Sequence, residues 1–325
     1  MTELRVGLLG CGGIGARHAG AVKALGERMA LVGCCGRDLD RTRAFAVEHG
    51  GIAYVDLDTM IDAGIDLLIA TLPPYNRHGE IEHAAQRGVH LLVEKPIALD
   101  MDSATRMVDV VEASGVVAAI GFMYRFGDAV RRWRSLDTGP VGLYVGGYYC
   151  NALHAHWWRK RALSGGQILE QAIHQVDLIR HLVGEPDSVY ARCANLFHRD
   201  VPDYDVEDVS AMIFGWDGGR LATLSASNIA IPGVWQKEWA VMAERMTGRF
   251  TSWNEAVLTR TQGEVMSEAI VGDTDPFVAQ LADVADAIGE KREPHIPLRE
   301  GAATLRLALA ALQSAKEGRE LRLAD

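Results

Sequence analysis

A glycine-rich stretch near the N-terminus constrains the fold of this chain more than any other feature. The apolar run Leu4–Leu9 predicts a strand buried on both faces, and the pattern from Ala16 to Leu25 predicts a helix. Between them stand three glycines in the spacing Gly-x-Gly-x-x-Gly, namely Gly10, Gly12 and Gly15. A strand, a glycine turn and a helix in this order are the context that a dinucleotide-binding fingerprint requires.

Each glycine has its own task in such a fingerprint. Gly10 allows the tight turn, Gly12 lets a pyrophosphate approach the backbone, and Gly15 lets the helix lie close to the strand. Amide groups at the helix start, where Gly13 and Ile14 stand, and the helix dipole would hold the phosphates. A glycine-rich turn in an α/β core with no nucleotide is the simpler alternative, which the flanking strand and helix disfavour.

Size and composition narrow the possible functions. The 325 residues suffice for two domains, and the net charge of −10 argues against a nucleic-acid partner. Apolar runs such as 116–120 are too short to span a membrane, and no basic segment or cleavage site precedes Leu4, so we expect no secretory leader. The five cysteines are odd in number and lack CxxC spacing, which indicates reduced thiols in a cytoplasmic protein.

Two regions differ in their hydrophobic pattern. Residues 1–121 alternate strand and helix, which predicts a doubly wound parallel sheet that binds ligands at the carboxyl ends of its strands. From Gly142 onward, alternating aromatic-rich runs predict an antiparallel sheet open on one face. A helix over Gln167–Val183 interrupts these runs, and helices near Pro276–Ile288 and Arg299–Lys316 close the chain. We therefore predict an α/β fold with domains at 1–121 and 122–325.

The residues after the second expected strand bear on the choice of nucleotide. An acidic residue about 20 positions past the glycine turn usually binds the adenosine ribose, but Gly36 stands there and Arg37 follows. Glycine leaves room for a 2′-phosphate, and arginine can pair with it, so NADP(H) is favoured over NAD(H). Alternatively, Arg37 is solvated and Asp38 binds the ribose, although Asp38 could equally cap the helix beginning near Leu39.

A lysine follows the strand expected at Val89–Val93. The sequence Glu94-Lys95-Pro96 places Lys95 at the carboxyl edge of the parallel sheet. Its ammonium could hydrogen-bond a substrate hydroxyl and stabilise the alkoxide that forms as hydride leaves, and Glu94 could orient it or pair with it. A surface ion pair at a strand end explains the spacing equally well.

Five motifs in order resemble the Gfo/Idh/MocA family. They are Gly10-x-Gly12-x-x-Gly15, Thr71-x-Pro73-Pro74-x-x-x-His78, Glu94-Lys95-Pro96, Gly121-Phe122-x-Tyr124-Arg125, and Gly165-Gly166 leading to His174-x-x-Asp177. The resemblance implies an NAD(P)-binding Rossmann domain and an α/β domain that binds substrate and whose open sheet forms a homodimer or homotetramer. It implies oxidation or reduction of sugars and cyclic polyols, and it puts Thr71, Pro73, His78, Glu94 and Lys95 at the cofactor.

The helix over Gln167–Val183 carries Glu170, His174, Asp177 and His181 on one face. Periodicity alone favours a solvated polar face. The resemblance instead makes His174 the group that exchanges the substrate's hydroxyl proton beside the nicotinamide. Glu170 stands where the family often has aspartate and could orient His174 or bind a substrate hydroxyl. Gln171 is a substrate-binding candidate, and Asp177 either contacts substrate or anchors the helix.

A loop over 151–161 offers rings and cations for a polyhydroxylated substrate. Its candidates are Trp157, Trp158 and Arg159, with Tyr124 near the domain junction as a further one. Packing of the domain seam is the alternative for the tryptophans, and Arg125 could be purely structural. His154 and His156 have metal-like spacing, but no third ligand stands nearby, so we expect no metal.

Together these features predict an NAD(P)-dependent oxidoreductase of a small sugar or polyol. In the oxidative direction His174 removes the hydroxyl proton while Lys95 stabilises the developing alkoxide, and the reverse steps reduce a carbonyl. Two alternatives within the family are a nucleotide-binding regulator without turnover and a glycosidase that uses tightly held NAD. The presence of both Lys95 and His174 argues against the regulator.

Overall fold

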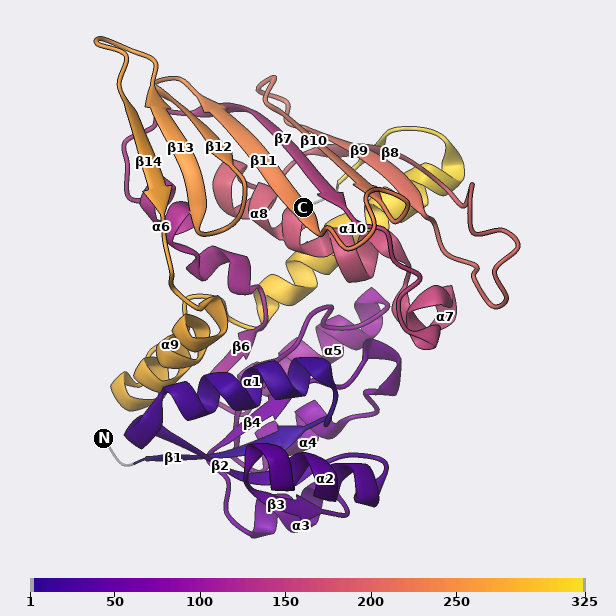
Figure 1. Ribbon diagram of the computed structural model, residues 1–325, viewed down its shortest axis with the longest axis vertical. Coiled ribbons are helices and arrows are strands. Elements are labelled where there is room, and N and C mark those ends of the chain that lie inside the picture. The colour runs from indigo at the N-terminus through magenta and orange to yellow at the C-terminus, as the bar shows by residue number, and fades with distance from the viewer. Residues whose placement is uncertain (1–2, 324–325) are drawn as a thin grey trace. The chain divides into compact units, whose positions relative to one another are not determined.

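The computed structural model describes residues 3–323, and the chain divides into two compact units. The first unit runs to Met123 and also includes Asp275–Ala302. The second unit comprises Tyr124–Thr274 and the chain from Ala303 onward. This division differs from the predicted one, because Asp275–Ala302 returns to the first unit (Figure 1).

The first unit contains the predicted parallel sheet. Its six strands lie in the order β3-β2-β1-β4-β5-β6, and every pairing is parallel. The strands are β1 (Leu4–Leu9), β2 (Met29–Cys35), β3 (Ile52–Tyr54), β4 (Leu67–Ala70), β5 (His90–Val93) and β6 (Ala118–Ile120). The helices are α1 (Gly13–Ala24), α2 (Leu39–His49), α3 (Leu57–Asp62), α4 (Glu80–Gln86) and α5 (Met101–Ala113). The predicted doubly wound fold, in which strands and helices alternate, is confirmed.

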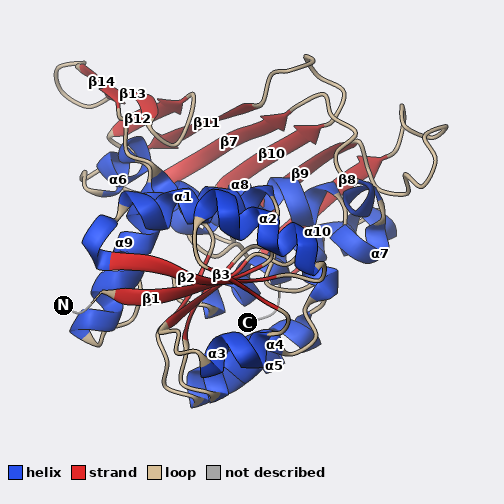
Figure 2. Ribbon diagram, turned by 60° about the horizontal axis from the view of Figure 1, so that its bottom comes forward, coloured by secondary structure: helices blue, strands red, loops and turns tan. Residues whose placement is uncertain are grey.

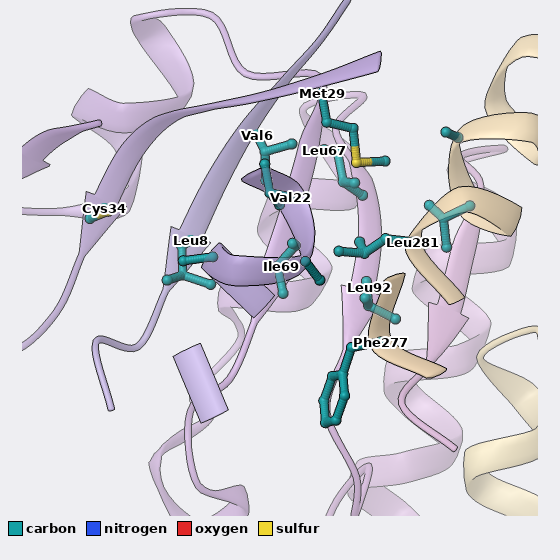
Figure 3. Packing of buried hydrophobic residues seen from close by; sticks show 14 of the residues in the cluster. Val6, Leu8, Val22, Met29, Cys34, Leu67, Ile69, Leu92, Phe277 and Leu281 are labelled. Carbon is teal, nitrogen blue, oxygen red and sulfur yellow. The ribbon is translucent and has the colours of Figure 1, made fainter. Parts of the chain in front are cut away.

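Helix α9 (Pro276–Glu290) belongs to the core of the first unit. Its buried residues Phe277, Leu281 and Val284 pack in one cluster with Val6 and Leu8 of β1 (Figure 3). Asp275 begins the helix, since its carboxylate accepts the amides of Phe277 and Val278. Burying each such side chain contributes roughly 1.5–3 kcal/mol. This packing is the physical reason why the segment leaves the second unit.

The second unit is built on a nine-stranded sheet of order β14-β13-β12-β11-β7-β10-β9-β8-β15. Only the central β7–β10 pairing is parallel among the described pairs, so the sheet is mixed and mostly antiparallel. The strands are β7 (Val141–Tyr149), β8 (Ser188–Ala194), β9 (Val209–Gly215), β10 (Leu221–Ser227), β11 (Gln236–Ala243), β12 (Met246–Phe250), β13 (Glu255–Arg260), β14 (Ser267–Val271) and β15 (Leu321–Arg322). Strands β13, β14 and β15 were not predicted.

Helices cover one face of this sheet. They include α8 (Ile173–Val183) and α10 (Arg299–Glu317), with the short α6 (Asp128–Arg134) and α7 (Arg161–Ser164) nearby (Figures 1 and 2). In the described part of the chain the other face carries no helix (Figure 2), and it exposes Val145 and Ile213 by 43% and 46%. No helix within residues 3–323 is long and apolar enough to cross a membrane.

Candidate active site

Thr71, the residue directly after β4, fixes the glycine turn. Gly10 has φ +108°, a conformation that favours glycine, and its amide donates to the Cys35 carbonyl at 2.8 Å. The Thr71 hydroxyl donates to the Gly10 carbonyl at 2.7 Å and to the Leu9 carbonyl at 3.2 Å. Thr71, predicted at the cofactor, therefore fixes the shape of the turn itself.

The start of α1 is open for an anion. Gly12 is the extended residue before the helix, and no side chain caps the helix N-terminus. Gly12, Gly13 and Ile14 are exposed, and a Cβ on Gly12 or Gly13 would meet nothing within 4 Å. A Cβ on Gly15 would instead overlap the Gly10 carbonyl oxygen. Uncapped amides at a bare helix N-terminus fit the phosphates of a dinucleotide.

The residues beyond β2 have separate tasks. The Asp38 carboxylate accepts the amides of Asp40 at 3.0 Å and Arg41 at 3.1 Å, so it caps α2. Arg37 is exposed. Gly36 also has a packing role, because a Cβ there would lie 2.8 Å from the Thr42 hydroxyl oxygen.

A buried histidine that the sequence analysis missed lies beside the Glu94-Lys95 segment. His18 of α1 is fully buried, and its Nε2 lies 2.8 Å from Glu94 Oε1. Glu94 Oε2 accepts the backbone amide of Lys95 at 3.1 Å. Burial raises the pKa of Glu94, but the hydrogen bond and charge of His18 and the charges of Lys95 and Arg77 outweigh it, so the pKa is lowered. Any Cβ on Gly121 would lie 3.0 Å from the Glu94 carboxyl.

Arg77 is a second residue that the sequence analysis missed. Its guanidinium donates to the carbonyls of Leu72, Glu94, Pro96 and Ile97 at 2.6–3.1 Å. Burial lowers its pKa to about 10. It thus fixes the backbone on both sides of Lys95, whose peptide bond to Pro96 is cis. Half-buried Pro73 and exposed His78 flank this region, and the His78 amide donates to Glu80 Oε2 at 2.6 Å.

His174 lies at the second position of α8, in the second unit, and is 8% exposed. Its ring stacks on Tyr124, with centroids 4.6 Å apart and planes 15° apart. Tyr124 stacks in turn on Trp253 at 4.6 Å. Burial and the neighbouring Tyr148 and Tyr144 raise the pKa of Tyr124 well above its usual range. Tyr124, predicted to bind substrate, therefore supports the His174 ring as a neutral phenol.

Asp177 and Arg125 form a buried pair. Arg125 donates to both carboxylate oxygens of Asp177, at 2.8 and 2.6 Å, and Thr304 donates to Oδ1 at 3.3 Å. This arrangement favours the anchoring role for Asp177. Burial and the charges of Arg125, Arg134 and Arg180 lower the pKa of His181, one turn further along α8, to about 3.

The turn before His174 is a π-turn over Ile168–Ala172. Glu170 lies within this π-helical turn and His174 follows it, so the shared face of these two residues stays a prediction. The Glu170 carboxylate accepts the Trp158 indole N–H at 2.7 Å. Gln171 donates to Cys150 Sγ at 3.7 Å, and its Oε1 has no hydrogen-bond partner within residues 3–323 although the residue is only 3% exposed.

The loop candidates fall into two groups. Trp158 is buried in a small cluster with Tyr204 and Val206, and Trp157 packs against it. Arg159 holds the loop, donating to the carbonyls of Leu153 and His154 at 2.8 and 3.0 Å. The two loop histidines have different neighbours, because His154 lies against Trp158 and His156 pairs with Asp203. Within residues 3–323 no three His, Cys, Asp or Glu side chains are grouped to hold a metal.

Comparison with known proteins matches both units to one family. The model described as "Oxidoreductase family, NAD-binding Rossmann fold" matches residues 4–122, and the one described as "GFO/IDH/MocA C-terminal domain" matches residues 135–247. The chain belongs to the Gfo/Idh/MocA family of oxidoreductases. Its membership explains why a glycine-turn unit is followed by a large mixed sheet.

Relatives within the Gfo/Idh/MocA family match along the whole chain. UDP-N-acetylglucosamine 3-dehydrogenase of Acidithiobacillus ferrooxidans is 26% identical over 330 residues, covering 96% of each chain. D-xylose 1-dehydrogenase (NADP(+)) 2 of Haloferax volcanii is 27% identical, covering 98% of this chain and 99% of its own. A solved levoglucosan dehydrogenase in complex with NADH and levoglucosan has a TM-score of 0.92 at 18% identity and covers 99% and 100% of the two chains. That likeness shows the shared fold.

Proposed function

We propose that this oxidoreductase transfers hydride between a nicotinamide nucleotide and a secondary alcohol or carbonyl of a sugar, inositol or related polyol. The observation that carries the proposal is the combination of two separate sites in one family member. The first unit offers an uncapped helix N-terminus with room for a phosphate at Gly12. The second unit offers a nearly buried imidazole, His174, held in one orientation by a stacked tyrosine.

In the proposed reaction His174 and Lys95 have separate roles at the substrate hydroxyl. In the oxidative direction His174 accepts the substrate's hydroxyl proton. The Lys95 ammonium donates a hydrogen bond to the oxygen as negative charge develops there. Arg77 and Glu94 fix the Lys95 backbone through the contacts described above. The nicotinamide, when bound, supplies the acceptor or donor for the hydride. Gln171, Trp157 and Arg159 are the further substrate-binding candidates.

NADP(H) is the proposed nucleotide. No acid stands at Gly36 to repel a 2′-phosphate, Arg37 is exposed, and the Asp38 carboxylate already caps α2. These three observations support the phosphate-bearing nucleotide over the bare ribose. We further propose a cytoplasmic homo-oligomer. The five cysteines, all of them free, suit a reducing compartment.

The variant His174→Asn tests the catalytic assignment. Asparagine keeps polarity at the site but cannot exchange a proton, so turnover should fall by at least about 100-fold while NADPH affinity stays unchanged. His83→Asn is the matched control, because His83 pairs with Asp58 on the exposed surface of α4. Full turnover in His174→Asn would refute the role of this histidine.

A further inference from the structure

Three of the five cysteines lie at the glycine turn and the end of β2. Cys34 and Cys35 are the last two residues of β2, and Cys11 stands between Gly10 and Gly12 in the turn. The Gly10 amide donates to the Cys35 carbonyl at 2.8 Å, and the Cys11 thiol donates to the same oxygen at 3.8 Å. Cys11 is therefore fixed against the end of β2.

Cys11 and Cys34 meet through their side chains. Cys34 is fully buried in the hydrophobic cluster of the first unit, and Cys11 packs against that cluster. The two side chains share a hydrogen bond. Cys35 does not belong to this cluster, because successive residues of a strand point to opposite faces of the sheet. Cys34 is thus the sulfur that faces Cys11.

The two thiols differ in acidity. The hydrogen bond with Cys34 lowers the pKa of Cys11, burial raises it and a hydrogen bond with Thr42 lowers it, so that the pKa is lowered in sum. The hydrogen bond with Cys11 and burial raise the pKa of Cys34. Cys11 also directly precedes Gly12, the residue before α1, and the positive end of a helix dipole favours a thiolate. Cys11 is therefore the nucleophile of the pair, and Cys34 keeps its proton.

The Cys11 sulfur lies close to both parts of the nucleotide site proposed above. Cys11 is half-buried, whereas Cys34 and Cys35 are buried. The next residue, Gly12, is exposed and leaves room for a phosphate. On its other side, Cys11 Sγ would lie 3.6 Å from a Cβ on Gly36, where the adenosine ribose is expected. An atom added to this sulfur would therefore disturb the binding of a nucleotide.

We propose that Cys11 is a site of reversible oxidation by peroxide, that Cys34 is its resolving thiol, and that oxidation weakens nucleotide binding. The Cys11 thiolate attacks one peroxide oxygen, the O–O bond breaks, and hydroxide leaves to take up the proton that Cys11 had released. Cys11 is then a sulfenic acid. The Cys34 sulfur next bonds to the Cys11 sulfur, and the sulfenic hydroxyl leaves as water with the Cys34 proton. The two sulfurs lose two electrons in total, and the peroxide gains them.

Oxidation and nucleotide binding should oppose each other. The turn has one tightly bonded shape, since the Gly10 amide binds the Cys35 carbonyl and the Thr71 hydroxyl binds the Gly10 carbonyl. A bond that draws Cys11 toward the core must move this turn. By linkage, a nucleotide that prefers the reduced enzyme also protects Cys11 from oxidation. The inference goes beyond the proposed function, because it needs a nucleotide at the turn but no particular substrate.

Mass spectrometry of the enzyme treated with hydrogen peroxide tests the proposal. Trypsin releases Cys11 in peptide 6–17 and Cys34 in peptide 29–37, so a disulfide should link these two peptides. Fragmentation of the linked peptides distinguishes Cys34 from Cys35. In Cys34→Ala the reaction should stop at the sulfenic acid, which dimedone traps on Cys11. The affinity of wild-type enzyme for NADPH, or for NADH if that binds more tightly, should fall by about tenfold or more and return with dithiothreitol.

Cys193 is the matched control, because it is also half-buried but burial raises its pKa. Cys193→Ala should lose as much affinity on oxidation as wild type, whereas Cys11→Ala should lose none relative to its own untreated form. Bound nucleotide should slow the labelling of Cys11 and leave that of Cys193 unchanged. Equal oxidation of Cys11 and Cys193, a disulfide to Cys35, or a loss of affinity in oxidised Cys11→Ala would overturn the inference. Absence of turnover with every sugar would contradict the proposed function alone, since none of these readouts needs a substrate.

Discussion

Arg37 is the residue on which the proposed preference for NADP(H) depends. It follows Gly36 at the end of β2, where Asp38 is already bonded to the start of α2. We expect Arg37→Ala to weaken NADPH binding by about tenfold or more, because a charge-assisted bond to the 2′-phosphate is lost. NADH binding should change little. Fluorescence titration of both nucleotides measures the difference, and equal losses for the two would contradict the assignment.

The pair His18–Glu94 gives a second prediction at the residue scale: its contribution to the free energy of unfolding should depend on pH. The lowered pKa of Glu94 means that its stabilising contribution is present above the unfolded value, about 4.3, and is lost as the pH falls below it. His18→Leu removes the bonded partner of this buried carboxylate and should cost about 1–3 kcal/mol at neutral pH.

Denaturant unfolding at neutral and at acidic pH measures this effect. The deficit of His18→Leu relative to wild type should shrink as the pH is lowered, because a protonated Glu94 needs its partner less. His18→Gln is the control, since an amide N–H can still reach the carboxylate. A deficit of equal size at both pH values would show that only the lost packing against Phe277 matters.

Residues whose partners lie far away in the sequence, such as His18 and Arg77, are hard to predict from the sequence. His18 meets a partner 76 positions away, and Arg77 meets carbonyls 5 to 20 positions away. Neither contact leaves a periodic signal. His174 was found because its motif resembles a family, whereas its support by Tyr124 and Trp253 depends on segments that only the fold brings together.

At the scale of elements, two glycines at the start of α1 have different tasks. Gly12 leaves room for the nucleotide, whereas Gly15 allows the helix to pack against the turn. A Cβ on Gly12 meets open space, but a Cβ on Gly15 would overlap the Gly10 carbonyl. We expect Gly12→Ala to fold with wild-type stability and to lose nucleotide affinity, because the methyl group would lie where the pyrophosphate approaches.

Gly15→Ala is the matched comparison on the same turn. It should lower the free energy of unfolding by about 1–3 kcal/mol, because helix and strand must separate to relieve the overlap. Thermal unfolding and NADPH titration of the two variants measure both effects. Wild-type affinity in Gly12→Ala would contradict the nucleotide site at this turn.

Continuous apolar runs made strands of the parallel sheet predictable, although the observed β6 (Ala118–Ile120) is shorter than the apolar run over 116–120. Other elements left weaker signals. The π-turn over Ile168–Ala172 follows a pattern that α-helical periodicity describes equally well. Strands β13 and β14 are six and five residues long and mix polar with apolar positions, and the return of α9 to the first unit depends on contacts with β1 and α1.

At the scale of the whole molecule, the open face of the nine-stranded sheet carries the expectation of a homodimer or homotetramer. Val145 and Ile213 are exposed there beside a hollow of about 520 Å³. Ile213→Lys should weaken self-association without unfolding the sheet, because its side chain already contacts solvent. Sedimentation measures the result, and a wild-type monomer at micromolar concentration would contradict the expectation.

Hydride transfer itself is the most direct test of the account. Purified protein is mixed with NADP⁺ or NAD⁺ and a panel of neutral and anionic sugars and inositols, and reduced-nicotinamide absorbance is followed. With one substrate deuterated at the oxidised carbon, we expect steady accumulation of reduced nucleotide that carries the deuterium. If nucleotide and sugar both bind, and neither reduced nucleotide nor transferred deuterium is found in either direction of the reaction, the protein is not the dehydrogenase proposed here.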